Sequence, residues 1–192
     1  MNKLSILSFS GILILFLLPG CRNEEKKFAG ESYINYPDVR MLLRDNLESY
    51  ESSALKFQLL KTEDGKKSSA TLTAQEMPWQ EIKNLFLQSD INSEKFDGKF
   101  SINVSEDSNT FTTLNYSCLD PQCPVRMFTL QATRQTGHLY SMYIDYKDIG
   151  FLSQIEYKIL YINGKLLQIQ EWTKMPFRSR RYIQRMYTFI TS

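Results

Sequence analysis

The side chains whose type and spacing most clearly suggest chemistry are the two cysteines in the segment CLDPQC. Cys118 and Cys123 lie on either side of Asp120 and Pro121, which favour a turn, and closely spaced cysteines usually pair in an oxidising compartment. Redox exchange typically uses Cys-x-x-Cys near the start of a helix, and a zinc site requires more ligands. We therefore predict a structural disulfide between Cys118 and Cys123, with free thiols as the main alternative.

Catalytic side chains are sparse in the rest of the chain. His138 is the single histidine, and a histidine without partners forms neither a triad nor a histidine-rich metal site. The carboxylate pairs Asp145–Asp148 and Glu24–Glu25 would have to face each other across a cleft to hydrolyse a glycoside. A solvated strand end and a solvated linker explain these pairs more simply. The sequence predicts no enzyme, no catalytic residue, no metal and no cofactor.

Charged residues are distributed most unevenly near the C-terminus, in the basic segment KMPFRSRRYIQRMY. Its cations alternate with aromatic residues and could face lipid phosphates, acidic glycans or an acidic protein. The alternative is a basic turn whose arginine stems cover neighbouring apolar surface. The candidate patch for an anionic partner consists of Lys174, Arg178, Arg180, Arg181 and Arg185.

The N-terminal segment is almost entirely apolar over residues 4–18 and follows Lys3. This pattern indicates a secretory signal, because a permanent span would need about 20 apolar helical residues. The run ends in Leu18-Pro19-Gly20-Cys21, which resembles the bacterial lipobox, although Pro19 departs from the usual small residue. The resemblance implies a diacylglycerol thioether on Cys21. An ordinary signal peptide that leaves a free mature cysteine is the alternative.

Three regions follow from this interpretation. We predict a lipoprotein signal peptide over 1–20, a lipidated cysteine with a flexible tether over 21–36, and one domain over 37–192. Position 22 is Arg rather than the Asp that tends to retain lipoproteins in the inner membrane of enteric-type bacteria, so we expect an outer-membrane anchor. The segment CRNEEKK also resembles a surface-export signal of Bacteroidota, although a solvated linker explains it equally well.

Hydrophobic periodicity predicts two helices. Apolar residues recur at three- and four-residue steps from Pro37 to about Ser52, and again from Trp79, which we expect to anchor the core. Asp64-Gly65 predicts the turn of a β-hairpin between the two helices, with a helix continued through Leu60 as the alternative. The Asp90-Ile91-Asn92 segment supplies too few oxygens for calcium and is interpreted as a turn.

After Gly98 the apolar period becomes two, which indicates strands. Asn163-Gly164 predicts a type I′ turn with two positive φ angles. The predicted fold is α+β: an antiparallel meander of seven to nine strands with two short helices on one face. A sheet of this size must curl, which is compatible with a curved half-barrel. The expected strands cover residues 100–104, 111–118, 125–133, 139–146, 154–162, 165–173 and 182–190.

A longer resemblance covers most of residues 54–192. Its features are Gly65-Lys66 in the hairpin turn, a helix that begins at Trp79 and carries Glu81 and Phe86, and the ending Asp90-Ile91-Asn92, followed by tyrosine-rich strands. These features are similar to small uncharacterised outer-membrane lipoproteins of Bacteroidota. The chain departs from that pattern at Ser93 and in its Cys118–Cys123 loop. The resemblance implies an envelope address and an α+β fold, and no activity.

Two functions remain open at this stage. The first is a non-catalytic lipoprotein, anchored in the membrane, that binds another envelope component or acts as an accessory module. The second is a carrier of a lipid or acyl chain, which requires that Tyr143, Tyr157, Ile159 and Trp172 line an open apolar cavity. The net charge of +2 argues against a nucleic-acid partner, which normally requires a strongly basic protein.

Overall fold

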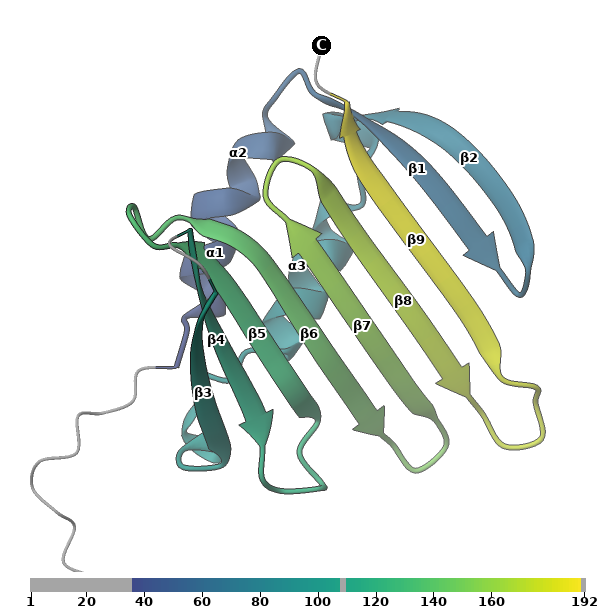
Figure 1. Cartoon of the computed structure of the whole chain (residues 1–192). Coiled ribbons are helices and arrows are strands. Elements are labelled where there is room, and N and C mark those ends of the chain that lie inside the picture. The colour runs from purple at the N-terminus through teal and green to yellow at the C-terminus, as the bar shows by residue number, and fades with distance from the viewer. Residues whose placement is uncertain (1–35, 108–109, 191–192) are drawn as a thin grey trace, which may run out of the picture. The chain divides into compact units, whose positions relative to one another are not determined.

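The computed structural model of the chain describes residues 36–107 and 110–190 (Figure 1). The predicted signal peptide, lipidation at Cys21, most of the tether and the Glu24–Glu25 pair lie outside the described residues. The described part forms an open antiparallel sheet with helices on one face (Figure 1). The α+β prediction of up to nine strands is confirmed at this level.

The nine strands of the described residues belong to one sheet, and the order across it is β2-β1-β9-β8-β7-β6-β5-β4-β3. From β3 to β9, each strand pairs with the next strand along the chain, as a meander requires. The strands are β1 Lys56–Glu63, β2 Lys66–Thr73, β3 Phe100–Asp107, β4 Phe111–Cys118, β5 Val125–Thr133, β6 Leu139–Ile149, β7 Gln154–Ile162, β8 Leu166–Lys174 and β9 Arg181–Ile190.

The early hairpin does not continue the meander at β3. Instead β1 pairs with β9, the last strand, from Lys56 opposite Ile190 to Glu63 opposite Ile183. The chain must therefore pass from one edge of the sheet to the other between β2 and β3. Helix α3, Trp79–Gln88, makes this crossing over one face (Figure 1).

The two turn dipeptides behave differently. Asp64 and Gly65 both have positive φ, 46° and 85°, as a type I′ turn requires. At the second dipeptide only Gly164 has positive φ, so the predicted type I′ turn at Asn163-Gly164 is wrong. The Asn163 side chain instead accepts hydrogen bonds from Tyr50 and Tyr161 hydroxyls, both at 2.8 Å. These side-chain contacts tie the turn to α2 and to β7.

The first predicted helix is divided into two. Helix α1, Val39–Asn46, begins at Asp38, whose carboxylate accepts hydrogen bonds from the Arg40 and Met41 amides. A single-turn helix α2, Glu48–Glu51, follows Leu47. Within the described residues, no helix has the length and apolar character needed to cross a membrane.

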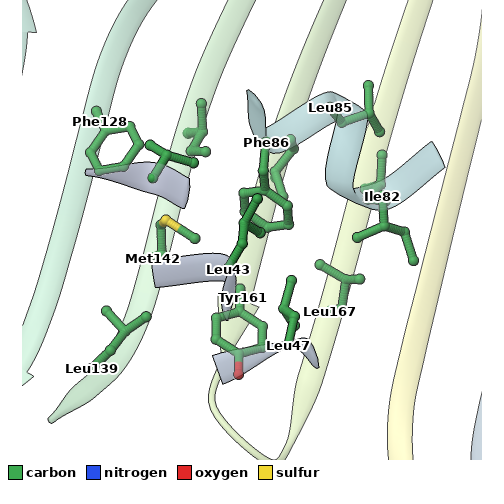
Figure 2. Packing of buried hydrophobic residues seen from close by; sticks show 14 of the residues in the cluster. Leu43, Leu47, Ile82, Leu85, Phe86, Phe128, Leu139, Met142, Tyr161 and Leu167 are labelled. Carbon is green, nitrogen blue, oxygen red and sulfur yellow. The ribbon is translucent and has the colours of Figure 1, made fainter. Parts of the chain in front are cut away.

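The core lies between the helices and one face of the sheet (Figure 2). Leu43 and Leu47 from the α1–α2 segment and Phe86 from α3 pack over the central strands, where Tyr161 is fully buried. Trp79 is 5% exposed, donates its indole N–H to the Ala74 carbonyl at 2.6 Å, and meets Phe57 edge to face. Its predicted role as a core anchor is confirmed.

Candidate functional site

Four hairpin loops meet at one end of the sheet, which we call the hairpin end: 64–65, 119–124, 150–153 and 175–180. These loops join β1 to β2, β4 to β5, β6 to β7 and β8 to β9. In Figure 1 the last three lie along the lower edge of the sheet, and the β1–β2 turn lies at its right-hand side. Loops 150–153 and 175–180 are direct neighbours, because Gln154, which follows the first loop, pairs with Lys174, which precedes the second.

Large apolar side chains protrude from this end. Phe151 is 100% exposed and Phe177 is 107% exposed, and Ile149, Leu152 and Met175 beside them are also exposed. An exposed apolar residue by itself is ordinary, whereas a contiguous group marks an interaction site. The loops at the tips of β6–β7 and β8–β9 therefore form the leading candidate surface of the described residues.

Phe177 occupies a strained position in its turn. The Arg178 amide donates to the Met175 carbonyl at 3.4 Å, so Met175–Arg178 form a β-turn with Pro176 at its second position. Phe177, at the third position, has φ of 61°, which in such a turn normally calls for Gly or Asn. A bulky residue in this conformation is an outlier. It indicates that the residue is held there by a functional constraint, because the conformation itself is unfavourable to the fold.

Four of the five predicted basic residues lie at the hairpin end. Lys174, Arg178, Arg180 and Arg181 are all exposed. None of the ion pairs among the described residues involves Lys174 or Arg178. Arg185 is placed elsewhere, on the helix-covered face of β9, so the structure does not bring all five together.

Arg181 is committed to a structural contact. It pairs with Glu63 of β1, and Glu63 also lies 2.7 Å from the Lys61 ammonium. The hydrogen bond from Lys61, followed by that from Arg181, lowers the pKa of Glu63 to about 2. This triad holds the β1–β2 hairpin against the start of β9.

One carboxylate collects three cations at the root of the protruding loops. Glu156 lies 3.1 Å from Arg180, 3.3 Å from Lys147 and 4.0 Å from Arg126. Burial alone would raise the pKa of Glu156, but the hydrogen bond and the charge of Lys147 lower it, with further contributions from Gln154 and Arg180. Three cations around one carboxylate leave the site with a positive excess.

Trp172 borders one of these cations, Arg180, on the helix-free face of the sheet. Its ring stacks on Tyr182 with centroids 5.2 Å apart, and the Arg180 guanidinium and the Lys158 ammonium lie 5.9 and 5.7 Å from its centroid. An open pocket of about 340 Å³ is lined by Gln154, Glu156, Trp172, Lys174 and Arg180. It offers cations and an aromatic wall to an anionic group.

A second open pocket, of about 490 Å³, lies between the loops after β4 and β6. Its lining includes Cys123, Arg126, Lys147 and Ile149. Two pockets with cationic walls therefore open beside the protruding side chains. A larger hollow of about 550 Å³ lies away from this end, beside the start of α3, and its lining includes Glu51 and Glu81 but no cation.

Cys118 and Cys123 are present as free thiols in the structure. The Cys123 thiol is 6% exposed and contacts the Val125 carbonyl at 3.1 Å. Burial, followed by its hydrogen bond with Cys118, raises the pKa of Cys123 to about 12. The two side chains therefore meet, as a disulfide would require, and the disulfide itself stays a prediction.

Arg185 belongs to a cluster on the opposite side of the sheet. It pairs with Glu81 of α3, and its second terminal nitrogen lies 3.6 Å from Glu171 of β8. Burial would lower the pKa of Arg185, but its hydrogen bond to Glu81 and the charge of that carboxylate raise it. Of the described buried side-chain polar atoms, only Nε of Arg185 lacks a hydrogen-bond partner. The residue joins helix to sheet.

The candidate catalytic residues are not brought together. Asp145 and Asp148 point to opposite faces of β6 by strand alternation, opposite Lys158 and Ile155 of β7. His138 is exposed, and only its backbone is hydrogen-bonded within the described part of the chain. Over residues 36–107 and 110–190, no cluster of three or more His, Cys, Asp or Glu could hold a metal.

The Asp90-Ile91-Asn92 segment forms the predicted turn. The Asp90 carboxylate accepts a hydrogen bond from the Asn92 amide at 3.0 Å, directly after α3. A side-chain oxygen that closes such a turn is typical of Asp.

Sequence reasoning missed several of the residues that define the hairpin end. Phe151 and Leu152 lie in a loop flanked by charged strands, and Phe177 lies in the sequence as one of several aromatic residues between cations. An apolar pair in a predicted hairpin loop is the signal that could have found Phe151 and Leu152. No pattern in the sequence indicates that Trp172 and Tyr182 stack beside Arg180.

Comparisons with family models, with curated proteins and with solved structures found no match to this chain. The similarity to Bacteroidota lipoproteins therefore stays a prediction. The candidate surface is defined by its geometry and charge alone.

Proposed function

We propose that this chain is a non-catalytic outer-membrane lipoprotein, anchored through Cys21, that binds another envelope component through its hairpin end. The observation that carries this proposal is the pair of fully exposed phenylalanines, Phe151 and Phe177, on neighbouring loops. Proteins rarely leave such a group of side chains in water unless a partner covers it. A tethered domain with one exposed apolar surface needs no catalytic residues to act as an accessory module.

The position of the strain supports a binding role. Phe177 adopts a conformation that costs free energy in the isolated domain, yet its side chain makes no buried contact because it is fully exposed. Phe177 has an unfavourable backbone conformation and contributes nothing to the core. A contact with a molecule outside the domain best explains why a phenylalanine occupies this position.

The carrier hypothesis receives less support. Ile159 is 1% exposed in the core and Tyr157 shares its face, whereas Tyr143 and Trp172 alternate to the helix-free face. The four residues therefore do not line one cavity. If the sheet curves as a half-barrel, the helix-covered part of its inner face is filled by side chains from α1 and α3 (Figure 2).

Site-directed photo-crosslinking in intact cells tests the proposed function. A photoreactive phenylalanine analogue replaces Phe151 in the full-length chain, and the same analogue replaces Gln135, an exposed residue in the loop at the opposite end of the sheet, as the matched control. We expect a discrete product, either protein or lipid, at position 151 and none at 135. Identical patterns at both positions would reject the hairpin end as a binding surface.

A second variant confirms that the contact depends on the apolar tips. Phe151→Ser with Phe177→Ser should abolish the product from a crosslinker placed at Leu152, while the protein level stays unchanged. Both phenylalanines are fully exposed, so the fold loses no buried contact in this variant.

A further inference from the structure

We propose that the component bound by the hairpin end is an anionic lipid bilayer surface, with the side chains of Phe151 and Phe177 inserted among the lipids. This inference rests on the proposed function and names the partner of the same surface. It adds a contact with the membrane that is separate from the predicted lipid anchor. The domain then lies on the bilayer in one orientation, with the hairpin end down.

The shape of the surface favours lipid. The apolar side chains stand at the tips of two loops, so each can enter a soft interface, whereas a protein partner would need a pocket for each. Phe151 and Leu152 form one tip, and Met175 and Phe177 form the next. Aromatic side chains in particular settle at the level of lipid head groups.

The charge around the tips fits an anionic head-group layer. The two hairpin segments 147–156 and 174–181 hold five cations and two carboxylates, a net charge of +3. The whole chain has a net charge of only +2, so the positive charge is concentrated here. Lys174 and Arg178 are exposed and take no part in the ion pairs of the described residues, which leaves them available to phosphates.

The two open pockets supply polar sites behind the apolar tips. One is lined by Trp172, Lys174 and Arg180 together with Glu156, and the other by Arg126 and Lys147 together with Asp148, so that cations outnumber carboxylates by two to one in each. A head group that reaches past the loops would meet cations in either pocket. Apolar tips backed by cations reproduce the layering of a bilayer, where acyl chains lie beneath phosphates.

Depth-dependent quenching in vesicles tests this inference. The protein is isolated as it occurs in its envelope, with any group on Cys21 in place, and added to vesicles of phosphatidylcholine with or without phosphatidylglycerol. A tryptophan is introduced by Phe151→Trp, by Phe177→Trp or, as the control, by Gln135→Trp. Quenching by lipids brominated on their acyl chains is measured as the difference from the parent protein, which contains Trp79 and Trp172.

We expect at least two-fold more quenching at either tip than at position 135 in the anionic vesicles. The excess should fall in pure phosphatidylcholine and at high salt. Neutralising Lys174 or Arg178, by Lys174→Gln or Arg178→Gln, should each lower the ratio of docked to undocked protein about five-fold, because one cation near an anionic surface contributes about 1 kcal/mol. Equal quenching at all three positions, or none at the tips, would overturn the inference.

The crosslinking experiment separates failure of this inference from failure of the proposed function. If the tips are not quenched but position 151 yields one protein product that is absent at 135, the hairpin end binds a protein and the membrane inference is wrong. If quenching and crosslinking both fail to distinguish the tips from position 135, the inference and the proposed function are both wrong.

Discussion

Phenylalanine has opposite roles in two regions of this molecule. Phe86 of α3 is 0% exposed and packs against the central strands, whereas Phe151, at the tip of the β6–β7 loop, is 100% exposed. The hydrophobic effect favours removal of both side chains from water, but only Phe86 is removed from water within the domain. The helix-covered face therefore provides stability, whereas the hairpin end leaves apolar surface in water, which is the basis of the proposed binding role.

The largest expected effect comes from truncating the buried member of this pair. Phe86→Ala should lower the free energy of unfolding by about 3–5 kcal/mol, because it removes buried apolar area and leaves a cavity. Phe151→Ala is the matched control and should change it by less than about 0.5 kcal/mol. Urea denaturation of both variants measures the difference, and similar losses would show that Phe151 packs inside the domain.

The predicted disulfide at the hairpin end should have the next largest effect on stability. We expect protein from an oxidising compartment to carry the Cys118–Cys123 bond, which for so short a loop should add about 2 kcal/mol to the free energy of unfolding. Alkylation should be carried out in denaturant, since burial keeps the Cys123 thiol protonated in the fold, with its pKa raised to about 12. Two alkyl groups added at these positions before any reductant would contradict the prediction.

Ion pairs should also differ between the interior and the surface. Glu171→Gln removes one partner of Arg185, a guanidinium side chain that is only 14% exposed, and should cost about 1–2 kcal/mol, below a fully buried pair because Glu81 remains. The control is Glu106→Gln, which breaks a pair with Arg134 in which both side chains are about half exposed. That change should cost less than about 1 kcal/mol. Equal thermal shifts would mean that Arg185 is solvated.

Relieving the strained turn should separate stability from binding. Phe177→Gly removes a side chain with no buried contact and suits a φ of 61°, so it should raise the free energy of unfolding by about 0.5–1 kcal/mol. The same change should weaken binding at the hairpin end. Destabilisation by Phe177→Gly would show that the side chain packs within the domain.

Acid should loosen the turn end of the β1–β2 hairpin, where Glu63 lies opposite Lys66. Because the pKa of Glu63 is lowered to about 2 from an ordinary value of 4.5, its contribution to stability is present above about pH 4.5. It is lost as the pH falls through about 2. Chemical shifts of the Lys61 and Arg181 side chains during an acid titration report the loss, and Glu63→Gln should remove this transition. A transition centred near 4.5 would show that the triad does not form.

Local patterns were sufficient to predict the elements. The second half of the β7 strand, from Lys158 to Ile162, alternates in burial as a period of two requires, and the helix that begins at Trp79 follows its apolar stripe. Asp64-Gly65 formed the turn that its backbone preferences favour. At Asn163 the same reasoning failed, because side-chain hydrogen bonds from Tyr50 and Tyr161 occupy that residue. Of these two contacts, the one from Tyr50 comes from a segment distant in the sequence.

The candidate surface was predictable only in part. The cations from Lys174 to Arg181 lie within eight positions of each other, so a local pattern could identify them as a group. Arg185 is also a cation, but strand alternation places it on the helix-covered face, where it pairs with Glu81 of α3. Phe151 is of interest because loop 175–180 with Phe177 lies beside it. The sequence around Phe151 does not specify that neighbour.

The sequence by itself determined where the strands, helices and most turns lie, because periodicity and turn preferences act over a few residues. It also determined the chemistry available: a candidate lipidation site, two cysteines, one histidine and a basic C-terminal segment. Only the tertiary structure decided that β1 pairs with β9 and that loops 150–153 and 175–180 are neighbours. Strand order depends on how distant apolar faces are buried together, and a pattern within one segment does not specify which distant strand it will meet.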